Sequence, residues 1–267
     1  MVRSWISETL RNENKFCFTV IDISEYSQIT KDVKKLLASS LILSFREIEH
    51  LKRRYENQPK MKLKEYIENK TFATRKDNFS IATRSGDWGE VFCGLVLDEF
   101  RGYTLPIKKL RWKINNDRSL FGTDVFSVKH DNDGEIESLV YSESKVRTAY
   151  SKNIGKEAYE SLYRDNGDSL PDIIDFISRV CYSNGNYDMA DKFDEVFLNI
   201  EDYNKEFQIF LLFDKKIWKE DILETLDEIP PELENLFVTV ILIDDLKDLI
   251  EETYKLTVEV GEELVYG

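Results

Sequence analysis

The sequence predicts an α/β protein with a mixed sheet flanked by helices. Two near-continuous apolar runs, residues 207–213 and 236–243, suit strands that are covered on both faces. Between them, residues 218–229 form an acidic amphipathic helical pattern that ends at Pro230 and Pro231, so this unit is a β-α-β motif with parallel strands. Upstream, residues 125–128 and 139–145 flank the turn signal at 130–134 and predict an antiparallel hairpin.

The remaining elements are assigned in chain order. Residues 16–21 are typical of a strand, residues 31–56 mainly of a helix, and residues 60–75 of a basic helix. A helix begins near residue 86 with Ser85 as its N-cap, and residues 109–113 alternate as on a half-buried strand. Residues 156–182 are helical with a break at 166–169 and Pro171, and residues 244–254 form another helix.

Candidate site residues lie on the predicted hairpin. Because residues two apart on a strand share a face, Glu143 and Lys145 project together, and antiparallel pairing brings Asp124 near Glu143. Two carboxylates beside an ammonium lose hydration when buried, and a divalent cation with oxygen ligands offsets that cost. The acid-any-Lys pattern occurs six times in this charged chain, so the tripeptide alone is not specific. The alternative is a salt-bridged pair on a solvated strand face.

A fourth candidate comes from the helix before the hairpin. Glu90 shares its helical face with small or apolar residues, which suits an acid that enters a site from a helix. The alternative is an exposed Glu on a helix weakened by glycine. That face comprises Gly86, Cys93, Gly94 and Leu97.

Charge is distributed unevenly along the chain. The net charge is −14, which argues against a free-standing, non-specific DNA-binding protein. Residues 186–267 carry −16, whereas residues 101–118 carry +5 and lie between the site helix and the first strand of the hairpin. We expect phosphate contacts there, and the alternative is an edge strand protected by its charges. The acidic part is either a plain solvated face or a surface that receives a protein partner.

Composition limits the other possibilities. Three scattered cysteines and two histidines offer little material for a zinc site or a histidine-based nucleophile. No apolar run is long enough to span a bilayer, no export signal is evident at the N-terminus, and a reducing cytoplasm fits. No P-loop motif is present, so we expect no ATP chemistry in this chain.

Four motifs together resemble the HamA family, the nuclease subunits of the Hachiman anti-phage defence system, which have a PD-(D/E)xK-type core. The motifs are Ser85-Gly86-Asp87-Trp88-Gly89-Glu90, residues 105–113, Gly122-Thr123-Asp124-Val125-Phe126 and residues 143–148. Thr123 replaces the Pro of the class name. The resemblance implies a restriction-endonuclease-like core. The turn signal at residues 183–186 and the change in charge predict a boundary there. We therefore expect a helical N-terminal part and the nuclease core within residues 1–185, and an acidic αβ portion at 186–267 that packs on the core.

The resemblance also implies roles for single residues. Asp124 and Glu143, with the Ser144 carbonyl, would bind Mg²⁺ or Mn²⁺; Glu90 would be an additional metal acid, and Lys145 would assist the attacking water. The activity would be hydrolysis of DNA in concert with HamB, a superfamily 2 helicase that controls it. A non-catalytic scaffold that docks through its acidic surface is the alternative. The expected DNA-contacting residues are Lys108, Lys109, Arg111, Lys113 and Arg147.

Overall fold

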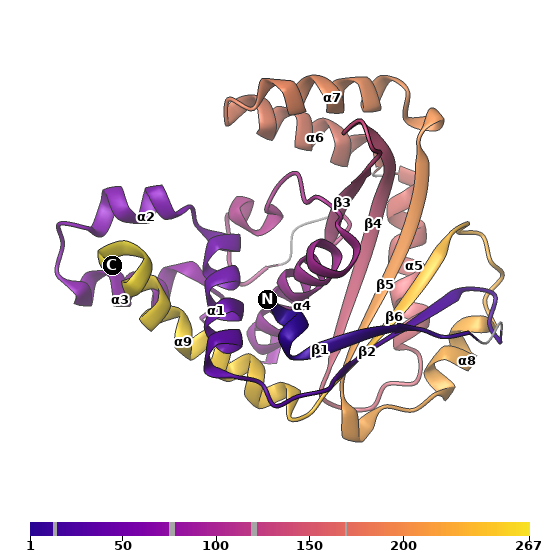
Figure 1. The fold of residues 1–267 in the computed structure, drawn as a ribbon, viewed down its shortest axis with the longest axis horizontal. Helices are drawn as coiled ribbons and strands as arrows, with labels where there is room; N and C mark the ends of the chain where they lie inside the picture. Colours follow the sequence, from indigo (N-terminus) through magenta and orange to yellow (C-terminus); the bar gives the residue numbers. More distant parts are fainter. Residues whose placement is uncertain (13–14, 75–77, 119–121, 169) are drawn as a thin grey trace.

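The computed structural model describes residues 1–12, 15–74, 78–118, 122–168 and 170–267. These residues contain one six-stranded mixed sheet with helices on both faces (Figure 1). The strands are β1 (Ile6–Leu10), β2 (Thr19–Glu25), β3 (Val125–His130), β4 (Ile136–Arg147), β5 (Asn204–Asp214) and β6 (Leu236–Ile243). The predicted α/β class with a mixed sheet is therefore confirmed.

Most of the helices fall in groups between pairs of strands along the chain. They are α1 (Lys31–Phe45), α2 (Ile48–Tyr55), α3 (Lys60–Tyr66), α4 (Asn78–Arg101), α5 (Ile154–Asp168), α6 (Leu170–Ser183), α7 (Tyr187–Leu198), α8 (Asp221–Asp227) and α9 (Leu246–Tyr266). Short helical turns are η1 (Val2–Ser4), η2 (Ile67–Thr71), η3 (Lys109–Trp112), η4 (Ile200–Asp202) and η5 (Lys215–Ile217). No helix in the described part of the chain is long and apolar enough to cross a bilayer.

The strand order across the sheet is β1-β2-β6-β5-β4-β3. The four inner strands run parallel to their inner neighbours, whereas the edge strands β1 and β3 pair antiparallel. β3 and β4 form the predicted hairpin, and Gly134 in its turn has a φ of +82°, which favours glycine. The predicted β-α-β unit is also confirmed, since β5 and β6 are parallel and joined through α8.

Residues on both sides of position 185 build this one sheet. β5 hydrogen-bonds to β4 along its length, so the acidic portion supplies strands to the middle of the sheet. The predicted boundary at residues 183–186 falls in the tight connection between α6 and α7, where Gly185 has a φ of +76°.

Each face of the sheet has its own apolar core. Helices α1, α4 and α9 cover one core, which includes Val146 of β4 and Phe210 of β5; we call this side the α4 face. Helices α5 to α8 contribute to the other core, which includes Tyr141 of β4 and Ile209 of β5; we call this side the α5 face. Alternate residues of one strand therefore serve two different helical layers.

Five predicted elements have different bounds in the structure. The long helix predicted over residues 31–56 breaks at Arg46, which is extended and donates to Tyr66 Oη and the Lys70 carbonyl. The site helix begins at Asn78 rather than near residue 86, so Ser85 is inside it and donates to the Ile81 carbonyl. The first long strand starts at Thr19 rather than at residue 16, and the last helix extends to Tyr266. The predicted helix 60–75 becomes α3 and a π turn, and its residue 75 lies outside the described residues.

The strand predicted over residues 109–113 is wrong. Lys109–Trp112 is a short 3-10 helix, with Arg111 N–H donating to the Lys108 carbonyl at 3.1 Å. Leu110 is buried, as alternation predicts, but Lys113 is buried as well. Two inward-facing positions three apart fit a helical turn better than a strand.

Candidate active site

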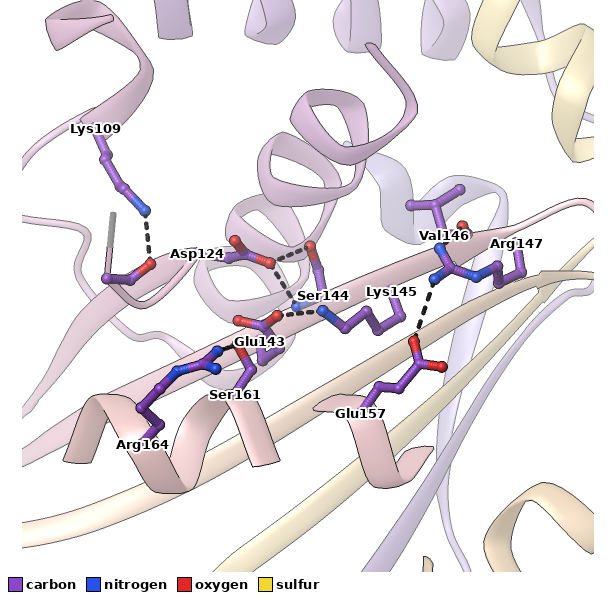
Figure 2. A network of polar contacts seen from close by, with 11 residues as sticks. Lys109, Asp124, Glu143, Ser144, Lys145, Val146, Arg147, Glu157, Ser161 and Arg164 are labelled. Carbon is purple, nitrogen blue, oxygen red and sulfur yellow. Dashed lines mark hydrogen bonds and ion pairs between the residues drawn. The ribbon is translucent and has the colours of Figure 1, made fainter. Parts of the chain in front are cut away.

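The hairpin connects Asp124 to the Glu143-Ser144-Lys145 segment. Val125 pairs with Ser142, so Asp124, just before β3, lies beside the next residues of β4. One carboxylate oxygen, Oδ2, accepts a hydrogen bond from the Ser144 amide at 3.0 Å and another from the Ser144 hydroxyl at 3.1 Å. Figure 2 shows this carboxylate turned toward β4. The structure therefore brings together the two segments that sequence analysis paired.

Glu143 and Lys145 form an ion pair on the α5 face of β4. Lys145 Nζ lies 2.5 Å from Glu143 Oε1; the Glu143 side chain is 6% exposed and that of Lys145 is 22% exposed. The Ser161 hydroxyl of α5 also forms a hydrogen bond with Glu143. In Figure 2 the side chains of Glu143 and Ser161 lie on the same side of β4. Glu143 and Lys145 therefore share one face of β4, as predicted, and their ion pair is mostly buried rather than solvated.

The environment of Glu143 favours its protonated form. Burial, and then the negative charge of Asp124, raises the pKa of Glu143 to about 7, although Lys145 and Ser161 act in the opposite direction. A buried carboxylate with an anionic neighbour loses hydration that one lysine does not fully replace. This pair of acids would gain from an additional cation.

Glu90 approaches Asp124 from α4. It lines a cavity of about 650 Å³ together with Asp124. Burial, and then the charge of Asp124, raises the pKa of Glu90 well above its ordinary value, and Lys109 opposes this change. Asp124 is thus the common neighbour of Glu143 and Glu90. Among the described residues, no three Asp, Glu, His or Cys side chains are grouped closely enough to hold one metal ion.

Lys109 holds the turn that presents Asp124. Its Nζ donates to the carbonyl of Gly122 at 3.0 Å and to that of Thr123 at 2.8 Å. Gly122 has a φ of +81°, a conformation that favours glycine. The role that the structure gives Lys109 is therefore to position this turn, and Figure 2 shows the contact to one of its carbonyls.

Two other basic residues of this segment are also engaged inside the protein. Lys113 is 1% exposed in its side chain, and its Nζ lies 2.5 Å from Asp87 Oδ1 on α4. Arg111 donates to the Leu43 carbonyl and forms an ion pair with Glu47 at 2.8 Å. Both basic groups tie the 109–113 segment to helices, so the structure does not present them as free phosphate contacts.

The last two expected DNA contacts remain accessible. Lys108 is exposed and lines the cavity. Arg147 is 38% exposed and lies 3.7 Å from Glu157 of α5, a loose pair that Figure 2 shows beyond Lys145. An exposed, weakly held guanidinium can contact a phosphate without leaving a buried partner unpaired.

One protein-family model matches most of the chain. The model of the HamA family matches residues 2–256, which include all the acids described above and Lys145. The chain belongs to the HamA family. This membership supports a role for the chain in Hachiman anti-phage defence. No curated protein matches the chain.

Two residues of this HamA-family chain have roles that sequence analysis missed. The sequence analysis predicts a role only for the Ser144 carbonyl, as a metal ligand. In the structure the Ser144 amide and hydroxyl donate hydrogen bonds to Asp124. Asp87 pairs with Lys113 and lies one helical turn before Glu90, a spacing visible in the sequence. Gly89 between them allows close packing, since a Cβ there would lie 2.5 Å from Val146 Cγ2 of β4.

Proposed function

We propose that the chain is a metal-dependent nuclease that hydrolyses DNA phosphodiester bonds in Hachiman defence. The observation that carries the proposal is the direct connection of Asp124 to the Glu143-Ser144-Lys145 segment. Two acids and a lysine, brought together from adjacent strands, are the residue types that metal-assisted phosphodiester hydrolysis requires.

The donor set suits Mg²⁺ or Mn²⁺. Asp124 and Glu143 provide carboxylate oxygens, which hard divalent cations prefer. The raised pKa of Glu143, caused by burial and by Asp124, indicates an uncompensated site for positive charge. Asp124 and Glu143 would hold the ion, with Glu90 as a further acid. When bound, the metal supplies a more acidic water and neutralises charge on the phosphate.

The protein groups around these acids have separate roles in the proposal. Lys145 is fixed by Glu143 and keeps part of its surface open, so its ammonium can orient a water or contact the phosphate. Ser144 and Lys109 keep Asp124 in place from two sides, through its carboxylate and through the preceding turn. Such pre-organisation reduces the reorganisation that catalysis would otherwise require.

The charge of the chain supports action with a partner. The net charge is −14, and the structure commits Arg111 and Lys113 to contacts inside the protein. Few accessible cations then remain beside the acids, and an acidic protein repels DNA. We propose that a HamB-like superfamily 2 helicase delivers the DNA and controls cleavage.

A matched set of variants tests the activity. Plasmid DNA is incubated with Mg²⁺ and with the purified chain, alone and with its helicase partner, and EDTA serves as the metal-free arm. We expect cleavage by the wild type and none by Glu143→Ala or Lys145→Ala. The controls are Glu137→Ala and Lys129→Ala, which break an exposed ion pair at 2.9 Å elsewhere on the same hairpin and should cut normally. Intact DNA in every arm, together with phage defence that survives both site substitutions, would exclude the nuclease.

One observation favours a second candidate function. Because the described residues contain no group of three metal-holding side chains, the chain could instead act as a non-catalytic scaffold. Its acidic surface would then serve for docking. The same assay separates the two functions, since a scaffold tolerates Glu143→Ala as long as the fold and partner binding persist.

A further inference from the structure

The cavity beside Glu90 and Asp124 is larger than a metal site needs. Its volume is about 650 Å³, within the range of pockets that hold small organic ligands. Its walls come from α1, α4, the segment 104–112, β3 and α6. Most of the lining is apolar, including Val91, Leu95, Leu105, Ile107, Ile173 and Ile177. The cavity therefore has room for a small organic group with a mainly apolar surface, next to the candidate site.

An aromatic pair forms part of the lining. Trp112 of η3 is 40% exposed, and its ring meets Phe176 of α6 edge to face, with centroids 5.9 Å apart and an angle of 83°. Trp5 and Trp88 are buried in the core, whereas Trp112 keeps part of its side chain accessible. Exposed aromatic rings beside basic groups are the usual platform for stacking unpaired bases.

Among the described residues, three acids and two lysines line the cavity, and one of these lysines, Lys109, donates to the Gly122 and Thr123 carbonyls. Glu90 and Asp124 belong to the candidate metal site, whereas Lys108 is exposed on the same segment as Trp112. A lysine and an exposed aromatic ring that line the same cavity match a nucleotide, which carries both a phosphate and a flat base. Asp98 is a further acid in the lining and would disfavour a second phosphate there.

We propose that this cavity binds an unpaired nucleotide of the strand to be cut, with its base on Trp112 and its phosphate near Lys108. The inference rests on the proposed nuclease function and deepens it by naming the substrate class as single-stranded or frayed DNA. A base inside a duplex is stacked on both sides and offers no free face to Trp112. Intact duplex would therefore not fill the cavity.

DNA-binding measurements with the full-length chain test this inference. Fluorescence anisotropy compares a labelled thymidine oligonucleotide with a blunt duplex, in low salt with Ca²⁺, which takes oxygen ligands as Mg²⁺ does. We expect the wild type to prefer the single strand, Trp112→Ala to weaken that binding roughly ten-fold, and Trp112→Phe to retain most of it. The control is Tyr182→Ala, which removes an exposed ring on α6 outside the cavity and should have no effect.

The outcomes separate this inference from the proposed nuclease activity. Three results would overturn the nucleotide site even if the protein cuts DNA. The wild type could prefer duplex, it could fail to bind the single strand measurably, or Trp112→Ala could bind the single strand as tightly as the wild type does. Absence of cleavage with Mg²⁺, alongside binding that depends on Trp112, would instead remove the nuclease and keep the nucleotide site. Circular dichroism of each variant shows whether a loss of binding reflects a loss of fold.

Discussion

Asp124 Oδ2 accepts two hydrogen bonds from Ser144, one from its amide at 3.0 Å and one from its hydroxyl at 3.1 Å. These bonds fix the Asp124 carboxylate, just before β3, on the neighbouring strand β4, which carries Glu143 and Lys145. The backbone bond needs no particular side chain, whereas the hydroxyl bond depends on Ser144 itself. The contribution of the serine can therefore be separated from that of the hairpin.

Ser144→Ala should lower the free energy of unfolding by about 1 kcal/mol, the usual net value of one hydrogen bond. It should also slow Mg²⁺-dependent cleavage several-fold, because Asp124 keeps only one of its two restraints. The matched control is Ser142→Ala, two residues earlier on the same face, since the Ser142 hydroxyl is buried and has no hydrogen-bond partner among the residues that the structure describes. Urea denaturation and a plasmid cleavage assay measure both effects. Equal behaviour of the two variants would show that the Ser144 hydroxyl does not position Asp124.

The raised pKa of Glu143 predicts that the stability of the protein depends on pH. Burial and Asp124 raise its pKa from 4.5 to about 7, so the folded chain binds this proton more tightly than the unfolded chain does. The free energy of unfolding should therefore fall as pH rises from about 4.5 to about 7, by up to about 1.4 kcal/mol per pH unit. Glu143→Gln should flatten that slope, which chemical denaturation across the pH range measures. An unchanged slope would show that folding does not raise the pKa of Glu143.

Mg²⁺ should stabilise the wild-type protein more at pH 8 than at pH 6. Above pH 7 the Glu143 carboxylate is ionised and repels Asp124, and a bound cation relieves that repulsion. Thermal unfolding with and without Mg²⁺ measures the difference, and Glu143→Gln should abolish most of it. A midpoint that responds to Mg²⁺ equally at both pH values would contradict metal binding by Glu143.

Local pattern in the sequence was enough for the hairpin, the β-α-β unit and the site helix. Turn residues and apolar periodicity determine such elements, and the spacing of Glu143 and Lys145 on one strand puts both on one face whatever surrounds them. The elements that were predicted wrongly depend on contacts between segments that are distant in the chain. Arg46 interrupts the predicted long helix because it binds Tyr66 and the Lys70 carbonyl, more than 19 residues away in the chain.

The basic segment shows the same limit for the site. Alternation of Lys and Arg with Leu110 and Trp112 resembles a half-buried strand with its charges outward, but Lys113 turns inward to meet Asp87, 26 residues earlier. The charge pattern of the segment does not reveal that partner. The sequence analysis includes only the Ser144 carbonyl for a related reason, because the hydroxyl acquires a role only once β3 is placed against β4.

Lys113 and Lys108 should therefore respond differently to substitution. Lys113→Met leaves the buried Asp87 carboxylate without its cation and should cost about 3–5 kcal/mol of stability, whereas the double variant with Asp87→Leu should cost less. Lys108→Ala should change stability by no more than about 0.5 kcal/mol but weaken DNA binding and reduce its salt dependence. Urea denaturation and anisotropy titrations at several salt concentrations separate the two effects. A stable Lys113→Met variant with reduced DNA binding would return Lys113 to the DNA interface.

Gly89 should be required for the close approach of α4 to β4. A Cβ at this position would lie 2.5 Å from Val146 Cγ2, so Gly89→Ala must push the helix that carries Glu90 away from the strand that carries Glu143. Overpacking of this kind costs about 1–3 kcal/mol. Gly86→Ala is the matched control, because a Cβ there meets open space and alanine favours a helix by about 0.5–1 kcal/mol over glycine.

A double-mutant cycle shows whether the clash is the cause. Val146→Ala removes the methyl group that Gly89→Ala meets, so the double variant should be less destabilised than the sum of the two single variants. Cleavage should recover with stability in the double variant, because Glu90 and Glu143 return to their positions beside Asp124. Purely additive effects would mean that Gly89 acts through helix propensity alone, and α4 would then have no steric requirement at the site.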